Sequence, residues 1–285
     1  MFGIQCAFTQ RVIDELSAQG FPPVALLLPG HPAIEQPLTV TPPGSTLPLV
    51  GAAKRSKPYS TYRVGQLASP AALELVSSLT PDYIVVACYP RLIPRRIRHL
   101  ARVMALNVHP SLLPQHRGPD PLFWIMRDGG AGCGVTVHEL SGRFDAGRIV
   151  AQQAVPYPEG AREADVESVL AAVGARLVAD LMASGEASTT HAVIKHEESY
   201  ESWPTEADYV VPAGSSVRLA WTFIRGVAER GIPITVMADT GTHVVTDAVA
   251  HGHDPNLPDA PDSNEVICAF HDGWLRAIAH DPTGD

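Results

Sequence analysis

The chain of 285 residues has little of what marks a redox, zinc-binding or membrane protein. Its four cysteines lie far apart and form no C-x-x-C pair, so nothing indicates a zinc site or a disulfide framework. The longest apolar runs, such as VALLLP and YIVVACYP, are much shorter than the roughly 20 residues of a membrane-spanning helix. The N-terminus has no basic segment ahead of an apolar stretch and a cleavage site. We therefore expect a cytoplasmic protein with no metal and no membrane partner.

Basic residues are scarce at one end of the chain. The net charge is -9, and it is unevenly divided, because residues 1–199 carry 17 Lys and Arg against 17 Asp and Glu, whereas residues 200–285 carry 4 against 13. A surface that binds phosphates normally requires clustered Lys and Arg. The acidic C-terminal segment therefore disfavours nucleic acid as a partner.

Strands and helices alternate over the first two thirds of the chain, which predicts an α/β fold with a mostly parallel sheet. The expected strands cover 3–8, 23–30, 81–90, 102–109, 133–140 and 148–157, and the expected helices cover 9–20, 69–79, 119–129 and 163–184. YIVVA lacks alternation, as is typical of a strand buried on both faces of a parallel sheet. Residues 29–62 contain seven prolines and little periodicity, so we expect a long loop there, either an insertion or a lid over a site.

The last part of the chain has a different pattern. A polar linker over 191–208 precedes an expected helix at 215–227 and short strands at 232–239, 243–252 and 265–280. We therefore predict an α/β domain over 1–190 and a small β-rich domain over 209–285.

Three polar residues lie where a parallel sheet usually binds ligands, at the carboxyl ends of its strands. Asn107 and His109 end one predicted strand, and their N-x-H spacing directs both side chains to one side. Asp145 lies in the loop SGRFDAG after another strand. An amide and an imidazole can stabilise an oxyanion, and a carboxylate can orient the imidazole and control its charge. This set predicts acyl transfer without a nucleophilic serine or cysteine.

The segment NVHPSLLPQHRG, preceded by VVACYPRLIP and followed by GVTVHELSGRFDAG, resembles the 10-formyltetrahydrofolate-dependent formyltransferases. The resemblance covers roughly residues 1–185 and implies a Rossmann-like catalytic domain over the predicted residues 1–190. The tail weakly resembles the small, barrel-like C-terminal domain of the methionyl-tRNA formyltransferases.

The resemblance also implies roles for individual residues. Asn107 and His109 would hold the formyl oxygen, and Asp145 would govern proton transfer. Arg117 and Gly118 either position a ligand or only shape a turn. The pterin pocket would be lined by Cys88, Tyr89, Pro90, Arg91, Leu92, Ser111, Leu112, Leu113 and Pro114.

The implied reaction is transfer of a formyl group from 10-formyltetrahydrofolate, a co-substrate, to a primary amine. A neighbouring carboxylate would keep His109 charged. Ser141 and Phe144 replace the acidic residue and the leucine that are more usual in this loop, and the first strand lacks the glycine turn of the tRNA enzymes. With the acidic tail, these departures favour a small acceptor, such as an amino sugar or an amino acid derivative, over methionyl-tRNA. Hydrolysis of the same donor and a non-catalytic, folate-binding regulator remain alternatives.

Overall fold

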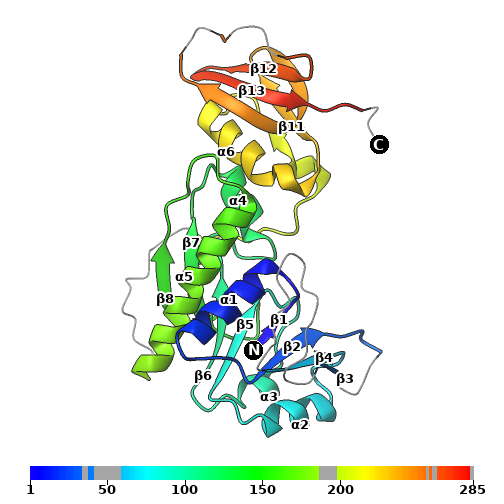
Figure 1. Ribbon diagram of the computed structural model, residues 1–285, viewed down its shortest axis with the longest axis vertical. Coiled ribbons are helices and arrows are strands. Elements are labelled where there is room, and N and C mark those ends of the chain that lie inside the picture. The colour runs from blue at the N-terminus through cyan, green and yellow to red at the C-terminus, as the bar shows by residue number, and fades with distance from the viewer. Residues whose placement is uncertain (34–37, 42–58, 186–197, 255–256, 259–261, 283–285) are drawn as a thin grey trace. The chain divides into compact units, whose positions relative to one another are not determined.

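The computed structural model describes residues 1–33, 38–41, 59–185, 198–254, 257–258 and 262–282, which form two compact units (Figure 1). The first unit contains Met1–Gly118, Gly134–Val155 and Glu167–Tyr200, and the second contains Pro119–Cys133, Pro156–Val166 and Glu201–Asp285. Two segments from the middle of the chain therefore cluster with the C-terminal strands. The predicted domain boundary at residue 190 lies outside the described residues. None of the helices within these ranges is long and apolar enough to cross a membrane.

The first unit is built on an eight-stranded sheet in the order β3-β4-β2-β1-β5-β6-β7-β8. The neighbours from β4 to β6 pair in parallel, whereas β3, β7 and β8 join antiparallel. The strands are β1 (Phe2–Gly3), β2 (Ala25–Pro29), β3 (Leu38–Thr41), β4 (Ser60–Val64), β5 (Tyr83–Ala87), β6 (Met104–His109), β7 (Gly134–Glu139) and β8 (Ile149–Ala154). The helices are α1 (Ala7–Ala18), α2 (Pro70–Ser78), α3 (Arg95–Arg98) and α5 (Glu163–Ser184), which begins in the second unit. The mostly parallel α/β sheet predicted from the sequence is confirmed.

Helices cover both faces of this sheet because successive strand residues point in opposite directions. In β2, Leu26 packs in one cluster with Ile13 of α1, whereas the next residue, Leu27, packs in another with Val76 of α2. Each of these side chains is buried. Figure 1 shows α5 on the same side of the sheet as α1. Burial on both faces explains the continuous apolar runs of the central strands.

The first strand is shorter than the sequence predicts. A strand was expected over 3–8, but β1 ends at Gly3 and α1 begins at Ala7. Cys6 caps the helix, because its Sγ accepts a hydrogen bond from the Thr9 amide at 3.4 Å. A side chain at residue 3 would lie 2.5 Å from Thr9 Cγ2, so only glycine allows this close approach. The carboxyl end of β1 therefore turns directly into a helix beside β5.

The sequence suggested that the proline-rich segment 29–62 is a long loop, but part of it forms strands. It contains β3 and β4, and β4 extends the parallel sheet beyond β2. The guanidinium of Arg91 donates to the carbonyls of Gly30 at 2.8 Å and Gly65 at 2.6 Å, which lie on either side of the segment. Residues 34–37 and 42–58 of this segment lie outside the described residues, so the choice between an insertion and a lid stays open.

The second unit contains a five-stranded sheet in the order β12-β13-β11-β10-β9. A backbone hydrogen bond of 2.8 Å from Asp239 to Ala269 joins the end of β10 to β12 and curls the sheet. Phe123, Tyr209 and Phe223 pack with ring centroids 5.0 to 6.4 Å apart in its core. The elements are α4 (Pro121–Arg127), β9 (Val210–Val211), α6 (Val217–Val227), β10 (Ile234–Ala238), β11 (Gly241–Gly252), β12 (Glu265–Phe270), β13 (Gly273–Ala279) and two short 3₁₀ helices (Glu206–Asp208 and Ala228–Arg230). The small β-rich region expected at the end of the chain is confirmed.

Candidate active site

Asn107 and His138 lie directly opposite each other on β6 and β7, so their side chains share one face of the sheet. The amide nitrogen of Asn107 lies 3.0 Å from Nε2 of His138, and Nδ1 of the same ring lies 2.9 Å from the Glu139 carbonyl. Because a carbonyl only accepts, Nδ1 carries the proton and Nε2 accepts from Asn107. His138 therefore accepts one amide hydrogen of Asn107, and the second has no protein partner among the described residues and is available to a substrate.

His109 ends β6 and is 4% exposed. Its Nε2 donates to the His116 carbonyl at 2.9 Å, which fixes the plane of the ring. Its Nδ1 faces Oδ1 of Asp145 at 3.5 Å. The imidazole is thus anchored through Nε2, and Nδ1 faces the Asp145 carboxylate.

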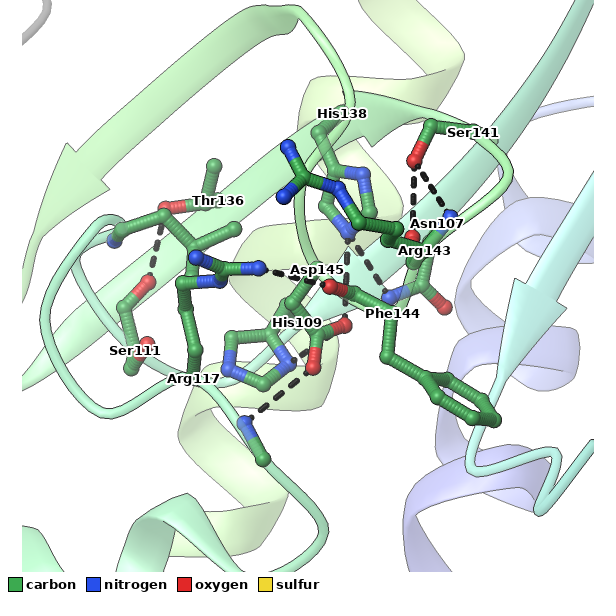
Figure 2. A network of polar contacts seen from close by, with 12 residues as sticks. Asn107, His109, Ser111, Arg117, Thr136, His138, Ser141, Arg143, Phe144 and Asp145 are labelled. Carbon is green, nitrogen blue, oxygen red and sulfur yellow. Dashed lines mark hydrogen bonds and ion pairs between the residues drawn. The ribbon is translucent and has the colours of Figure 1, made fainter. Parts of the chain in front are cut away.

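Asp145 joins the two histidines, as Figure 2 shows. Its Oδ1 lies 3.5 Å from His109 Nδ1 and 3.6 Å from His138 Nε2, and its Oδ2 accepts from the Gly118 amide at 3.2 Å. The backbone of Asp145 has a φ of 49°, an uncommon conformation for a residue other than glycine. The loop therefore holds this carboxylate in a specific orientation, and the backbone amide of Gly118 binds it. The expected contact of Gly118 with a ligand stays a prediction.

For both His109 and Asp145, burial and the neighbouring charge act on the pKa in opposite directions. Burial lowers the pKa of His109 below its ordinary value of 6.5, although the Asp145 carboxylate acts in the other direction. Burial opposes ionisation of Asp145, but the neighbouring His109 and His138 rings and the hydrogen bond from the Gly118 amide lower its pKa to about 2. At neutral pH the site therefore holds a carboxylate beside a neutral imidazole. The charged His109 expected from the sequence is not the resting form, because the carboxylate does not outweigh burial.

Arg117 holds the loop that carries Asp145. Its guanidinium donates to the Phe144 carbonyl at 3.1 Å and pairs with the Glu198 carboxylate. Its backbone amide donates to the Ser199 carbonyl at 3.3 Å. Arg117 therefore contacts the protein's own loop, and its predicted role in positioning a ligand stays a prediction.

A cavity of about 60 Å³ opens beside Asn107, His138 and Asp145. It is lined by the end of β5, by four residues of the segment 89–93 and by residues of the loop 140–145. Tyr89, Arg91 and Leu92 of the predicted pterin segment line it, whereas Cys88 and Pro90 are exposed and do not. Asp145 lines the cavity and also contacts His109, so the carboxylate connects the imidazole to this space.

Residues 111–114 lie apart from this cavity and are largely buried. The Ser111 hydroxyl donates to the Gln115 carbonyl at 2.8 Å, and the Ser111 carbonyl accepts from Thr136 at 2.7 Å. The Leu113 carbonyl accepts from Gln152 at 2.8 Å. The structure thus shows Ser111, Leu112, Leu113 and Pro114 supporting the end of β6, and their contact with a pterin stays a prediction.

His138 is the site residue that the sequence reasoning missed. HEL ends a strand of alternating residues, so His138 alone resembles a packed histidine. The antiparallel pairing of β6 with β7 places it opposite Asn107, 31 positions away. A correct prediction of the β6–β7 pairing would have identified His138 as a site residue.

Comparison with known proteins fits this geometry. A family model described as formyl transferase matches residues 4–180. The chain belongs to the formyl transferase family. A methionyl-tRNA formyltransferase of Chloroflexus aggregans is 28% identical over 280 residues, which cover 92% of this chain and 88% of that protein.

Solved structures agree on the fold of this formyltransferase. HypX from Aquifex aeolicus in complex with tetrahydrofolic acid has a TM-score of 0.55 and 18% identity, and the match covers 97% of this chain but 43% of HypX. Methionyl-tRNA formyltransferase from Clostridium thermocellum has a TM-score of 0.52 and 12% identity, and covers 87% of this chain and 92% of that one. The Rossmann-like formyltransferase fold expected from the sequence is confirmed, with a separate C-terminal sheet.

Proposed function

We propose that this formyltransferase moves the formyl group of 10-formyltetrahydrofolate to a primary amine on a small molecule, such as an amino sugar or an amino acid derivative. Asn107, His109 and Asp145 are the proposed catalytic residues. Their arrangement supports formyl transfer for two reasons. One amide hydrogen of Asn107 is available beside the cavity, and the Asp145 carboxylate, which lines the cavity, contacts the neutral imidazole of His109. Family membership and the tetrahydrofolate complex of HypX support a folate donor.

The proposed reaction begins when the amine nitrogen attacks the formyl carbon. The carbonyl electrons move to oxygen, and the free amide hydrogen of Asn107 stabilises the oxyanion. The amine loses a proton towards Asp145, and this proton comes to rest on Nδ1 of His109, which faces that carboxylate. The bond from carbon to N10 then breaks, the oxyanion reforms the carbonyl, and the imidazolium returns the proton to N10. Tetrahydrofolate and the formamide leave.

The charges of the C-terminal region support a small acceptor over tRNA. It has four basic residues, and three of them pair with acids of the same unit: Arg225 with Asp247 at 3.6 Å, Arg230 with Asp120 at 2.6 Å, and Arg276 with Glu265 at 3.9 Å. Such pairs neutralise the cations that would otherwise bind phosphates. Arg218 remains as an exposed basic residue. The region therefore offers little positive surface to an RNA backbone.

Methionyl-tRNA is the second candidate acceptor, and the relative from Chloroflexus aggregans favours it, because the alignment extends over most of both chains. Water is the third, since a site that activates an amine could also activate water. A non-catalytic role as a folate-binding regulator would leave the paired carboxylate and imidazole without a purpose.

The test is release of tetrahydrofolate from 10-formyltetrahydrofolate by the full chain, measured with the donor alone, with charged initiator tRNA and with a panel of amino sugars and amino acid derivatives. We expect a small amine to stimulate release and tRNA to have no effect. Stimulation by tRNA alone would refute the proposed acceptor. Full release without an acceptor would identify a hydrolase, and no release under any condition would refute catalysis.

A further inference from the structure

Two thiols meet at the carboxyl ends of neighbouring parallel strands. Gly3 of β1 is paired with Ala87 of β5, and Cys6 and Cys88 follow these strands. Thr9 connects the two ends, because its hydroxyl donates to the Ala87 carbonyl at 3.1 Å and lies 3.4 Å from Cys6 Sγ. The side chains of Cys6 and Cys88 lie close enough to affect each other's ionisation. The fold thus brings together two cysteines that are 82 positions apart in the sequence.

The two thiols differ in acidity. The neighbouring Cys88 side chain lowers the pKa of Cys6 to about 6; burial opposes this, and hydrogen bonds from the backbone amides of Thr9 and Phe8 at the start of α1 add to it. The pKa of Cys88 is raised well above 9 by its interaction with Cys6, and burial of its thiol and the Glu167 carboxylate act in the same direction. At neutral pH the pair therefore consists of a thiolate and a protonated thiol, which is the state that reacts with electrophilic oxygen or sulfur.

The remaining two cysteines provide a contrast within the same chain. Cys133 and Cys268 are buried, at 5% and 0% exposure, and burial raises the pKa of each to about 11. Cys6 is partly exposed, and Cys88 is exposed as a whole residue, although its thiol group is turned inward. Reactivity should therefore be confined to the pair.

We propose that Cys6 and Cys88 form a dithiol modification site, oxidised by hydrogen peroxide to a Cys6–Cys88 disulfide. The Cys6 thiolate attacks one peroxide oxygen, the O–O bond breaks, and hydroxide leaves, so that sulfur is oxidised to a sulfenic acid. The Cys88 sulfur then attacks the Cys6 sulfur. A disulfide forms, and the displaced hydroxyl leaves as water with the Cys88 proton.

Oxidation should also affect donor binding, an expectation that rests on the proposed function. Cys88 begins the segment 88–92, of which Tyr89, Arg91 and Leu92 line the cavity beside Asn107. Cys88 has a φ of 55°, so its backbone is already held in an uncommon conformation. A covalent bond to Cys6 would restrain this segment. We expect weaker binding of tetrahydrofolate by the oxidised protein.

The test uses the full chain and measures the modification of its cysteines, with no need for enzyme activity. The protein is treated with hydrogen peroxide, its free thiols are alkylated, and its peptides are identified by mass. We expect one cross-linked peptide pair joining Cys6 to Cys88, with Cys133 and Cys268 still alkylated. In untreated protein under native conditions at neutral pH, Cys6 should be alkylated at least about 100-fold faster than Cys133 or Cys268. Cys88→Ser should stop at a sulfenic acid on Cys6, and Cys6→Ser should leave Cys88 reduced.

Equal alkylation of Cys6 and Cys268, or oxidation of Cys6 in wild type without a link to Cys88, would overturn the proposed site. Neither measurement needs turnover, so both can succeed or fail independently of the proposed formyl transfer. Tetrahydrofolate affinity should fall about tenfold on oxidation and return after reduction with dithiothreitol. Unchanged affinity in a fully cross-linked protein would overturn the link to the donor segment.

Discussion

Asn107 and His138 face each other across the β6–β7 pair, with the amide nitrogen 3.0 Å from the imidazole Nε2. Because the Glu139 carbonyl at 2.9 Å fixes the proton on Nδ1, Nε2 must accept from Asn107. The amide is therefore prevented from turning its oxygen towards His138. In the proposed reaction, this strand pairing decides which atom of Asn107 meets the formyl oxygen.

This relationship predicts that His138 positions Asn107. His138→Phe keeps a planar ring in a site that is 2% exposed but removes the acceptor, so kcat should fall about tenfold or more, while KM for the donor changes little. His138→Gln restores an acceptor oxygen and should recover part of kcat. Steady-state kinetics of both variants provide the measurement. Equal kcat values for His138→Phe and wild type would contradict the positioning role.

The protonation of His109 predicts the pH dependence of the reaction. In the proposed reaction a neutral imidazole takes the proton of the amine, and burial lowers the His109 pKa, so the acid limb of kcat/KM should lie below pH 6.5. The Asp145 carboxylate opposes that lowering. Asp145→Asn should therefore move the limb to still lower pH and also reduce kcat. A wild-type limb above pH 6.5, or an upward shift in Asp145→Asn, would refute this assignment.

The loop that carries Asp145 depends on a close backbone approach at Gly147. A Cβ on residue 147 would lie 1.6 Å from the Glu139 carbonyl, whereas a Cβ on Gly142, in the same loop, would meet nothing within 4 Å. Gly147→Ala should therefore displace Asp145 and lower kcat/KM about 100-fold, as expected for a misplaced catalytic group. The matched variant Gly142→Ala should keep nearly full activity. Similar kinetics in the two variants would show that the close approach does not matter.

Stability of the second unit should depend on Arg230. Its guanidinium binds Asp120 and Glu163 and lies 5.2 Å from the centre of the Phe123 ring. Arg230→Ala leaves two partly buried carboxylates without their partner and should cost about 3 kcal/mol of unfolding free energy. Arg218→Ala, at an exposed position of α6, should change it by less than about 0.5 kcal/mol. Chemical unfolding of the two variants, each compared with wild type, makes the comparison, and equal midpoints would contradict it.

The sequence predicted much of the fold because hydrophobic patterns are local. Buried strands such as β5 and amphipathic helices such as α5 were found from runs and spacing alone. The end of the first strand was harder to predict from the sequence, because the capping of α1 by Cys6 is what shows that β1 ends at Gly3. β3 and β4 were missed because prolines surround them, and their pairing partners decide their conformation.

The site residues that lie within short sequence motifs could be predicted from the sequence. Asn107, His109 and Asp145 follow strands and lie within recognisable segments, and the structure brings them together. The contributions of His138 and Arg117 depend on contacts with residues 31 and 81 positions away. The neutral state of His109 depends on burial. These properties emerge only from the folded chain.

The most direct test of formyl transfer is to follow the carbon itself. The full chain would be given 10-formyltetrahydrofolate with a ¹³C-labelled formyl group, together with the small amines and charged initiator tRNA in one mixture, and every product would be examined by mass spectrometry and NMR. We predict that the label appears as a formamide on a small amine, and that Asp145→Asn strongly slows its appearance. Label found only on tRNA or only in free formate would contradict the proposed acceptor, and label retained on the folate would contradict formyl transfer altogether.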